Sequence, residues 1–474
     1  FFFQPESANP QAVESRGLGD VYKRQLQDRR SAVKSAGKSV RADIAALCDE
    51  GSFVELSTFS FSKSELFPEG AAGEGVVAGF ITIDGYPFCV VAQNGEVLGG
   101  GVSEAGCKKI AKCLSGAEKS NTPVIYMLSS KGVRIGEGVN ALEGLAEVLL
   151  KAAQLKGSVL QFCIIDGEVY GQIAALAAIC DFSFFIKNKS VLAENSPLVL
   201  AAKSGVNASA KELGGADGLK NANLVAFNVD SVSAVRKKIL AITSAVSPAV
   251  VDCDEMNTVV EALNSTPSAE NLLKLFDGGS LVEVGSLYSP EVKCVLGRMG
   301  GISCAAIIFG GDGVLLDAAK VRKIKDFAEL ACCRELPLVF FVNCAGLRPD
   351  IATHDSLVLK EIAELINVLD CCDKKVSVIS GKAVGLGYTL FAAKSMGYDY
   401  TFAFATAKVA LFDGVQGAEI EFAGENVGKE MLEKRYSEET SDPVNAARNG
   451  YIDNIIEPAF AKQYIVACLQ TLLP

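Results

Sequence analysis

The chain has 474 residues, of which 49% are hydrophobic and 21% are charged, and its formal net charge is −11 at pH 7. This length exceeds one hydrophobic core and suits two domains of roughly 220 residues each, while the high apolar content excludes an intrinsically disordered chain. The negative charge argues against nucleic acid as the main partner, although a local basic pocket for an anionic ligand stays compatible with it.

Residues 1–25 show no hydrophobic periodicity that continues into the segment after them. They resemble translated adapter sequence, and they lack the apolar centre of a secretion signal. We therefore treat 1–25 as a non-native segment and expect the native chain to have begun before Leu26. Residues 26–50 mix basic residues with Ile44 and Leu47, which predicts a short amphipathic helix.

The segment from about residue 75 to residue 186 alternates predicted strands and helices. Strands are predicted at Gly75–Ile83, Phe88–Ala92, Pro123–Leu128, Val159–Ile165 and Phe182–Ile186. Helices are predicted at Ser103–Cys113 with Ser103 as the N-cap, at Ala141–Leu155, and from the turn Gly167–Gly171 to Ile179.

The second half repeats this order. Its predicted elements are the strands Ser303–Phe309, Leu338–Val342 and Val376–Ile379, the helix Ala318–Arg334, and the turn Lys382–Gly387. Strands that alternate with helices predict an α/β protein of parallel ββα units, with the helices covering the sheet.

An internal repeat supports this division. Gly51–Leu56 returns 228 residues later as Gly279–Val284. Four further landmarks recur 214 residues later: Lys109-Ile110, Pro123, Gly132 and Gly171 become Lys323-Ile324, Pro337, Gly346 and Gly385. A constant offset indicates two homologous modules. The weakest pattern lies over 230–268, so we place the boundary near residue 246 and expect domains at 26–246 and 247–474.

Two strand-to-helix turns are the candidate sites. One is Gly167–Gln172 and the other is Gly381–Gly387, and they lie at equivalent places in the two modules. Backbone N–H groups that open a helix lack intrahelical acceptors and can hold an oxyanion without any charged side chain. Alternatively, these glycines only allow tight packing of helix on sheet. The equivalent positions favour the functional interpretation.

Side-chain catalysis and metal chemistry are poorly supported. The chain has one histidine, His354, and it contains neither G-x-S-x-G nor H-E-x-x-H nor a P-loop. Its fifteen cysteines include no C-x-x-C, so we expect buried thiols in a reducing cytoplasm and no metal. The loop Gly99–Gly101 is a weak match to a phosphate cradle. Backbone stabilisation of an enolate or ureide anion is the favoured mechanism.

Several motifs resemble the carboxyltransferase subunits of biotin-dependent acyl-CoA carboxylases and decarboxylases. They are Gly51–Leu56, Gly99–Glu104 before Lys108–Ile110, Arg134–Gly138, Glu212–Ala216, and Ala447–Asp453 with Glu457-Pro458. The resemblance runs from about Val40 to Leu473. It implies two tandem crotonase-like ββα-spiral domains, the first on the acyl-CoA side and the second on the biotin side.

The resemblance also implies site residues. Gly171 and Gln172 would stabilise the thioester enolate, and Leu386 and Gly387 would face the biotin ureido oxygen. The cofactor-binding residues that it implies are Gly100, Gly101, Gly132, Arg134, Gly346, Gly385 and Thr389, the last at a position where family members tune acyl-chain size.

In the implied reaction, a carboxyl group moves between carboxybiotin and an acyl-CoA such as propionyl-CoA or acetyl-CoA, or in reverse from methylmalonyl-CoA or malonyl-CoA. No Ala-Met-Lys-Met motif for biotin attachment is present, so biotin would arrive on a separate carrier protein with its biotin carboxylase. The expected assembly is a homo-oligomer, either a dimer or a trimer of dimers.

The chain departs from the family pattern at both sites. Gly171-Gln172 replaces two glycines, Ser129–Ile135 replaces Asp-Ser-Gly-Gly-Ala-Arg-Ile, and Gly385–Tyr388 replaces Gly-Gly-Ala-Tyr. These changes leave a second interpretation open, in which the chain is a divergent scaffold subunit with weak or no activity beside an active relative. A crotonase-type hydrolase or isomerase is a more distant alternative.

Overall fold

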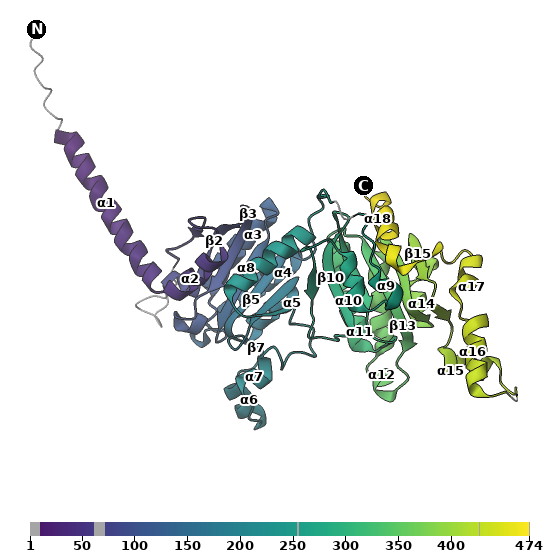
Figure 1. Ribbon diagram of the computed structural model, residues 1–474. Coiled ribbons are helices and arrows are strands. Elements are labelled where there is room, and N and C mark those ends of the chain that lie inside the picture. The colour runs from purple at the N-terminus through teal and green to yellow at the C-terminus, as the bar shows by residue number, and fades with distance from the viewer. Residues whose placement is uncertain (1–9, 61–71, 254–255, 426, 474) are drawn as a thin grey trace, which may run out of the picture. The chain divides into compact units, whose positions relative to one another are not determined.

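The computed structural model describes residues 10–60, 72–253, 256–425 and 427–473 (Figure 1). The chain forms two compact units. Unit 1 extends to Asp217 and includes Val229–Arg236, whereas unit 2 contains Gly218–Asn228 and Lys237–Pro474.

The sheet of unit 1 begins antiparallel and continues parallel. Its strand order is β1-β2-β3-β4-β5-β6-β8, with β7 paired to β5 off this path. The pairs from β1 to β3 are antiparallel, and those from β3 to β6 are parallel. The strands are β1 (Val54–Leu56), β2 (Val76–Ile83), β3 (Tyr86–Gln93), β4 (Val124–Ser130), β5 (Gln161–Tyr170), β6 (Phe182–Ile186), β7 (Val191–Ala193) and β8 (Phe227–Val229).

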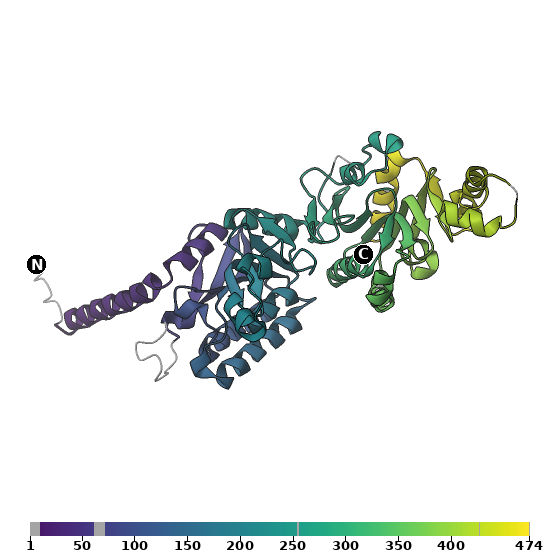
Figure 2. The same ribbon diagram turned by 90° about the horizontal axis from the view of Figure 1, so that it is seen from below.

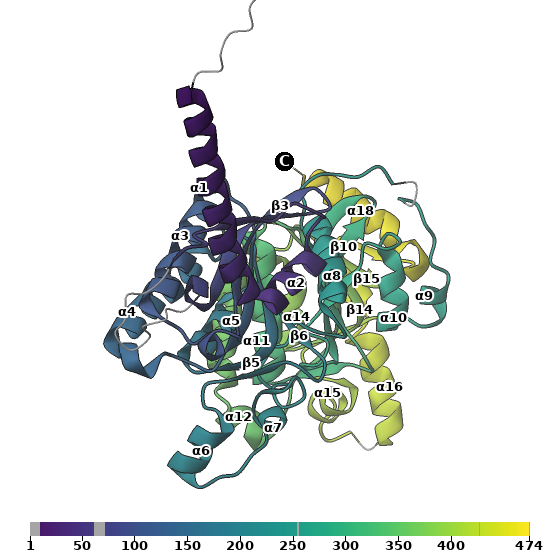
Figure 3. The ribbon, with the colours of Figure 1, turned by 90° about the vertical axis from the view of Figure 1, so that its left-hand side faces the viewer.

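Two long helices of unit 1, α3 and α4, lie side by side in Figures 1 and 3. Each buries an apolar stripe, and α3 packs on β2 and β3. The helices up to residue 245 are α1 (Pro10–Ser35), α2 (Lys38–Leu47), α3 (Glu104–Ser120), α4 (Val139–Leu155), α5 (Ala175–Ile179), α6 (Pro197–Ser204), α7 (Ala210–Gly214) and α8 (Val232–Ala245), which starts in unit 1 and ends in unit 2.

The sheet of unit 2 repeats the plan of unit 1. Its order is β17-β15-β14-β13-β11-β10-β9, with β12 paired to β13 and β16 to β14. The strands are β9 (Val282–Val284), β10 (Val292–Met299), β11 (Ile302–Phe309), β12 (Val314–Leu316), β13 (Leu338–Leu347), β14 (Lys375–Val384), β15 (Tyr400–Phe404), β16 (Lys408–Ala410) and β17 (Asn454–Ile456). Even the break in register recurs, between Leu128 and Ser130 in unit 1 and between Val342 and Cys344 in unit 2.

Several helices of unit 2 pack on this sheet, whereas α15 and α16 pack on each other, as Figure 2 shows in yellow-green. The helices of unit 2 are α9 (Ala262–Ser265), α10 (Ala269–Leu272), α11 (Ala318–Cys333), α12 (Ile351–Asp355), α13 (Val358–Asp370), α14 (Leu386–Phe391), α15 (Gly414–Glu421), α16 (Lys429–Glu439), α17 (Pro443–Arg448) and α18 (Ala461–Thr471).

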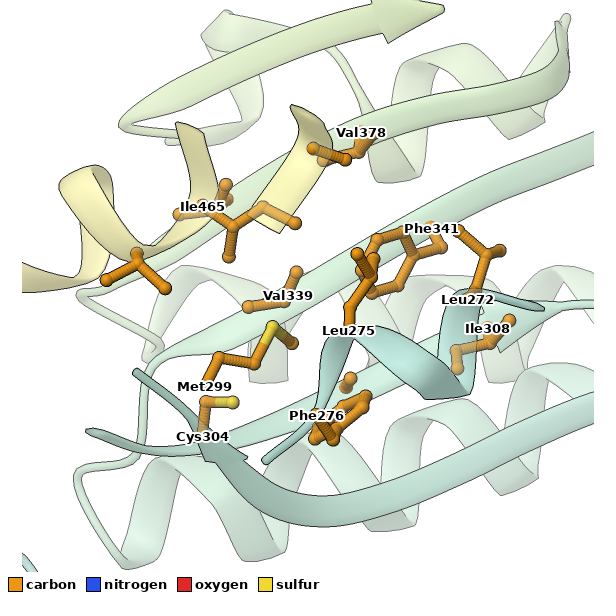
Figure 4. Packing of buried hydrophobic residues seen from close by; sticks show 14 of the residues in the cluster. Leu272, Leu275, Phe276, Met299, Cys304, Ile308, Val339, Phe341, Val378 and Ile465 are labelled. Carbon is orange, nitrogen blue, oxygen red and sulfur yellow. The ribbon is translucent and has the colours of Figure 1, made fainter. Parts of the chain in front are cut away.

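A hydrophobic core holds α10 and α18 against the sheet of unit 2. Leu272, Phe341, Val378 and Ile465 belong to one buried cluster, and Met299 and Cys304 fill the space between the larger side chains (Figure 4). Burying an aliphatic or aromatic side chain of this size contributes about 1.5–3 kcal/mol. Short elements such as α10 are therefore stable only through this packing.

The predicted tandem α/β architecture is confirmed, and so is the N-cap of α3, where Ser103 Oγ accepts the Gly106 N–H at 3.0 Å. Three predictions were wrong. The segment 26–50 contains two helices, α1 and α2, and α1 begins at Pro10, inside the segment excluded from the fold. The strands β5 and β14 continue to Tyr170 and Val384 instead of ending before Gly167 and Gly381, because β7 and β16 pair with their second halves. Cys333 and Cys371 are exposed, although most of the other cysteines are buried as expected.

Within the described ranges, no helix is long and apolar enough to cross a membrane.

Candidate active site

The two candidate turns have similar backbone conformations, each with a glycine of positive φ before a helical turn. Gly171 follows β5 with φ 81° and donates its N–H to the Glu194 carbonyl at 2.8 Å. Gly385 follows β14 with φ 52° and donates its N–H to the Ala410 carbonyl at 3.0 Å. Positive φ favours glycine at both positions, because a side chain would clash with the following peptide.

The next two N–H groups of each turn are the available donors. In the described residues, the N–H groups of Gln172 and Ile173 have no acceptor, and neither do those of Leu386 and Gly387. The expected pair Leu386 and Gly387 is thus present as two adjacent donors. In the first turn Glu194 accepts the N–H of Gly171, so the two adjacent donors without an acceptor are those of Gln172 and Ile173. The catalytic role of the predicted pair Gly171 and Gln172 stays a prediction.

The position of Ile173 was accessible to sequence reasoning. Gly387 lies 214 residues after Ile173, which is the offset of the repeat. The acceptors Glu194 and Ala410 carry no sequence signal, since any residue supplies a carbonyl.

The loop before α3 lies against the first turn. Gly100, with φ 65°, comes so close to the end of β4 that a Cβ there would be 2.0 Å from the Ser129 carbonyl oxygen. Beside Gly101, a Cβ would meet Arg134 Cγ at 3.0 Å. Gly132, with φ 110°, lies next to Gly171, whose Cβ would be 3.4 Å from the Gly132 Cα. The structure therefore brings these four glycines together.

Arg134 holds this loop from inside. Its guanidinium is 3% exposed and pairs with Glu74 at 2.8 Å and with Glu137 at 3.2 Å. It also donates to the Glu74 backbone carbonyl at 3.2 Å. With these partners, Arg134 acts as a positioning residue for the glycine loop. The sequence did not point to Glu74, which lies 60 residues earlier.

The second turn packs even more closely. Gly387 is buried, and a Cβ there would be 2.8 Å from both Cβ and Sγ of Cys344. Gly346, with φ 98°, ends near Val384, whose carbonyl oxygen would lie 3.4 Å from a Cβ. Thr389 is exposed on α14 and donates its hydroxyl to the Gly385 carbonyl at 3.2 Å.

Two tyrosines and one thiol near the turns are neutral near pH 7, whereas Glu168 and Lys382 of the turns are held in ion pairs with Lys131 and Asp413. Burial raises the pKa of Tyr170, which precedes Gly171, and that of Tyr388 on α14. Burial also raises the pKa of the Cys344 thiol to about 11. His354 lies exposed on α12, and in the described part of the chain no three His, Cys, Asp or Glu side chains cluster as metal ligands. The chemistry of these turns is that of backbone donors.

The carboxyl transferase domain family matches residues 32–473. The chain is 28% identical over 509 residues to the propionyl-CoA carboxylase beta chain of Saccharopolyspora erythraea, covering 96% of this chain and 92% of that one. It is also 28% identical to the methylmalonyl-CoA decarboxylase subunit alpha of Veillonella parvula, covering 92% of this chain and 90% of that one.

The fold is similar to that of transcarboxylase 12S, a hexamer whose structure was solved with methylmalonyl-coenzyme A and methylmalonic acid bound. The two chains superpose with a TM-score of 0.87 at 23% sequence identity, over 99% of this chain and 96% of the other.

Proposed function

The chain belongs to the carboxyl transferase family, and on that premise we propose that it moves a carboxyl group between an acyl-CoA and biotin carried by a separate protein. Its substrates would be propionyl-CoA with methylmalonyl-CoA, or acetyl-CoA with malonyl-CoA. The observation that carries the proposal is the pair of equivalent turns, each with two adjacent N–H groups that lack an acceptor.

The first turn suits a thioester oxygen. Two fixed N–H donors stabilise the negative charge that develops on this oxygen when the α-proton leaves, and removing one such donor costs typically 10²–10³ in rate elsewhere. Gln172 and Ile173 would supply these donors. The acyl-CoA would lie along Gly100, Gly101 and Gly132, a loop that close packing against Ser129 and Arg134 holds beside the first turn.

The second turn suits a ureido oxygen in the same way. Leu386 and Gly387 would donate to it, and Gly385, whose N–H is bonded to Ala410, fixes the direction of both donors. Carboxybiotin, when bound, supplies the carboxyl group and the base that the turns lack. The neutral Tyr170 and Tyr388 add no competing charge at either turn.

A second candidate function rests on two side chains. Gln172 is exposed and Leu386 is half-buried, and both stand where the sequence pattern of the family has glycine. Bulk at these positions would keep ligands away from the donors. A scaffold subunit without transfer activity is the alternative that this observation favours.

An assay of radiolabelled carboxyl transfer distinguishes the carboxyltransferase from the inactive scaffold subunit. We expect the purified chain to move label from free carboxybiotin to propionyl-CoA or acetyl-CoA, and from methylmalonyl-CoA or malonyl-CoA to free biotin. Binding of these CoA esters without transfer in either direction would establish the scaffold function. Absence of both binding and transfer would reject both candidates.

We also propose that the chain works as a homo-oligomer with a biotin carrier protein and its carboxylase in the cytoplasm. The hexameric assembly of transcarboxylase 12S supports the oligomer. Sedimentation velocity of the purified chain, alone and with a carrier, tests this part separately.

A further inference from the structure

Unit 2 contains an open cavity of about 990 Å³ that the proposed reaction does not use. It is lined by the loop Gly310–Leu315 after β11, by residues at the ends of β13, and by Ser380–Lys382 of β14. Ligands of α/β sheets commonly bind at the carboxyl ends of such strands. Gly381 and Lys382 of the second turn line the cavity, whereas its donor residues Leu386 and Gly387 are not among the described lining residues.

Five basic side chains line the cavity, although the whole chain carries a net charge of −11. They are Lys293, Lys320, Arg348, Lys382 and Lys408, and we call this space the basic cavity. Their ion-pair partners are fewer than the cations. Lys320 and Arg348 share Asp317, at 2.5 and 3.3 Å.

The other pairs leave further donors available. Lys382 pairs with Asp413 at 3.0 Å, and Lys293 pairs with Glu283 at a longer 3.3 Å. Lys408 donates to the Ser437 carbonyl at 3.2 Å. Three carboxylates therefore pair with four of the five cations, while Glu270, Glu291 and Asp312 also line the cavity. Each ammonium or guanidinium has more donors than these contacts use.

Charge is distributed unevenly along the basic cavity. At one end of its loop, Gly310 donates its N–H to the Glu291 carbonyl at 2.9 Å, and Glu270 lines the cavity near it. At the other end, a Cβ on Gly313 would lie 2.9 Å from Lys382 Cδ. The lining acid Asp312 directly precedes Gly313, so an anion would bind beyond it, on the side of Lys382.

The internal repeat shows that the positive charge of the basic cavity is specific to unit 2, because unit 1 has different charges or contacts at the same positions. Arg348 and Lys382 occupy the positions of Arg134 and Glu168 in unit 1. Whereas the Arg134 side chain is 3% exposed between two carboxylates, the Arg348 side chain is 42% exposed with one carboxylate at 3.3 Å. At the second position the charge is reversed, from a glutamate to a lysine.

We propose that the basic cavity binds a phosphate-bearing small molecule, with its phosphate groups against Lys320, Arg348, Lys382 and Lys408. A guanidinium and several ammonium groups together are the donors that phosphate oxygens prefer. The volume suits a whole small molecule rather than an isolated phosphate, since ligand sites measure about 300–1,000 Å³. This inference does not depend on carboxyl transfer.

Isothermal titration of the full chain with inorganic pyrophosphate and with ADP tests the proposal. We expect the wild type to bind at least one of them. We expect the double variant R348Q/K408Q to bind it at least tenfold more weakly. The control K429Q/K434Q removes the same charge from α16, where these lysines are 85% and 75% exposed, and should change the dissociation constant less than twofold.

Three results would overturn the proposal: no binding by the wild type, unchanged binding by R348Q/K408Q, or equal losses in both double variants. The thermal midpoint of each variant checks its folding. If R348Q/K408Q unfolds, K382Q takes its place in the same comparison, because its partner Asp413 is 46% exposed and stays solvated. Tenfold weaker binding by K382Q is again the expected result, and unchanged binding would reject the site.

Discussion

Single residues at the two turns decide whether the backbone donors are usable. Gly387 is the sharpest case, because its Cα faces Cys344 with no room for another carbon. The N–H groups of Leu386 and Gly387 keep their direction only while Gly387 stays in close contact with Cys344. The bulky neighbours Gln172 and Leu386 change what can approach, but they leave the backbone geometry of the turns in place.

G387A should lower carboxyl transfer at least tenfold, which corresponds to about 1.4 kcal/mol of transition-state stabilisation. The added Cβ would lie 2.8 Å from Cys344 Sγ, so the turn must move and misdirect both donors. G428A is the matched control, because a Cβ there meets nothing within 4 Å and the residue has φ −62°. Transfer rates for G387A and G428A that fall together would contradict this account.

Breaking the pair of Glu74 and Arg134 should destabilise unit 1. The variant E74Q leaves a buried guanidinium without its nearest charge, and losses of about 3–5 kcal/mol are typical for such changes. Denaturant unfolding measures the loss. K108Q is the control, because Lys108 and its partner Glu104 are 65% and 41% exposed, and such surface pairs contribute about 0–1 kcal/mol. Similar losses of unfolding free energy in E74Q and K108Q would show that the buried pair of Glu74 and Arg134 contributes no more to stability than a surface pair.

At the scale of elements, corresponding helices of the two units begin in the same way with different residues. Ser103 caps α3 by accepting the Gly106 N–H, and Asp317 caps α11 by accepting the Lys320 N–H at 3.0 Å. Ser103 also donates to Glu74 at 3.1 Å. The N-cap of α3 is thereby hydrogen-bonded to the ion pair of Glu74 and Arg134, which positions the glycine loop.

S103A should cost about 0.5–2 kcal/mol of stability through the lost cap. It should also weaken acyl-CoA binding, because Glu74 loses a donor beside Arg134. Unfolding in urea and titration with propionyl-CoA measure the two effects. S115A, on the same helix, removes a hydroxyl that bonds only within that helix and to Lys151, and should leave acyl-CoA binding unchanged. If S103A binds propionyl-CoA as tightly as the wild type, the N-cap of α3 has no influence on the glycine loop.

The helices α3 and α11 also bury one lysine each, Lys109 and Lys323, at equivalent positions of the repeat. Lys109 donates to the Val76 carbonyl at 2.5 Å, and Lys323 donates to that of Tyr288 at 2.6 Å. Burial lowers both pKa values, that of Lys109 to about 8. A buried ammonium ion in each unit therefore ties a helix to the start of the sheet.

Between pH 8 and 10.5 the unfolded chain binds a proton at Lys109 that the folded chain has released, so this residue makes stability rise with pH. Below pH 8 both states are protonated and the slope vanishes. K109M should lack this rise. Unfolding free energies of K109M and wild type at pH 7.5, 8.5 and 9.5 measure it, with K108M as the exposed control. The difference in unfolding free energy between wild type and K109M should shift toward the wild type as the pH rises, and a difference that stays constant would contradict this assignment.

Sequence reasoning located elements whose own residues determine them. Phe182–Ile186 is five buried residues in a row, and its predicted bounds match β6. The second halves of β5 and β14 could not be read in this way, because Asp166–Glu168 and Gly381-Lys382 are half-buried and become strand only by pairing with β7 and β16. For the same reason sequence reasoning could not tell which N–H groups of each turn lack an acceptor, because this depends on a carbonyl supplied from a distant segment of the chain.

At the scale of the whole molecule, each of the two units is built from two separate stretches of the sequence. Gly218–Asn228 belongs to unit 2, although Val229–Arg236, which follows it, belongs to unit 1. Within unit 2 this segment makes specific bonds, since Ala226 accepts the Gly285 N–H at 3.0 Å and Asn223 donates to Asp326 at 2.7 Å.

A fragment of residues 218–474 should therefore be more stable than a fragment of residues 237–474, by several degrees in its thermal midpoint. The shorter fragment lacks the partners of Gly285 and Asp326, whose buried or ordered groups then lose hydrogen bonds worth about 0.5–1.5 kcal/mol each. Thermal scans of both fragments measure the difference. Equal midpoints would place the boundary after residue 237, closer to the predicted position near 246.

This arrangement bears on how such a gene can be divided. The polypeptide passes between the units at Asp217, at Asn228 and at Arg236, so no single break yields two halves that each hold all of their own residues. A break after Arg236 leaves eleven residues of unit 2 attached to the first product. Two separately translated halves would then carry that segment on a different polypeptide from the unit to which it belongs.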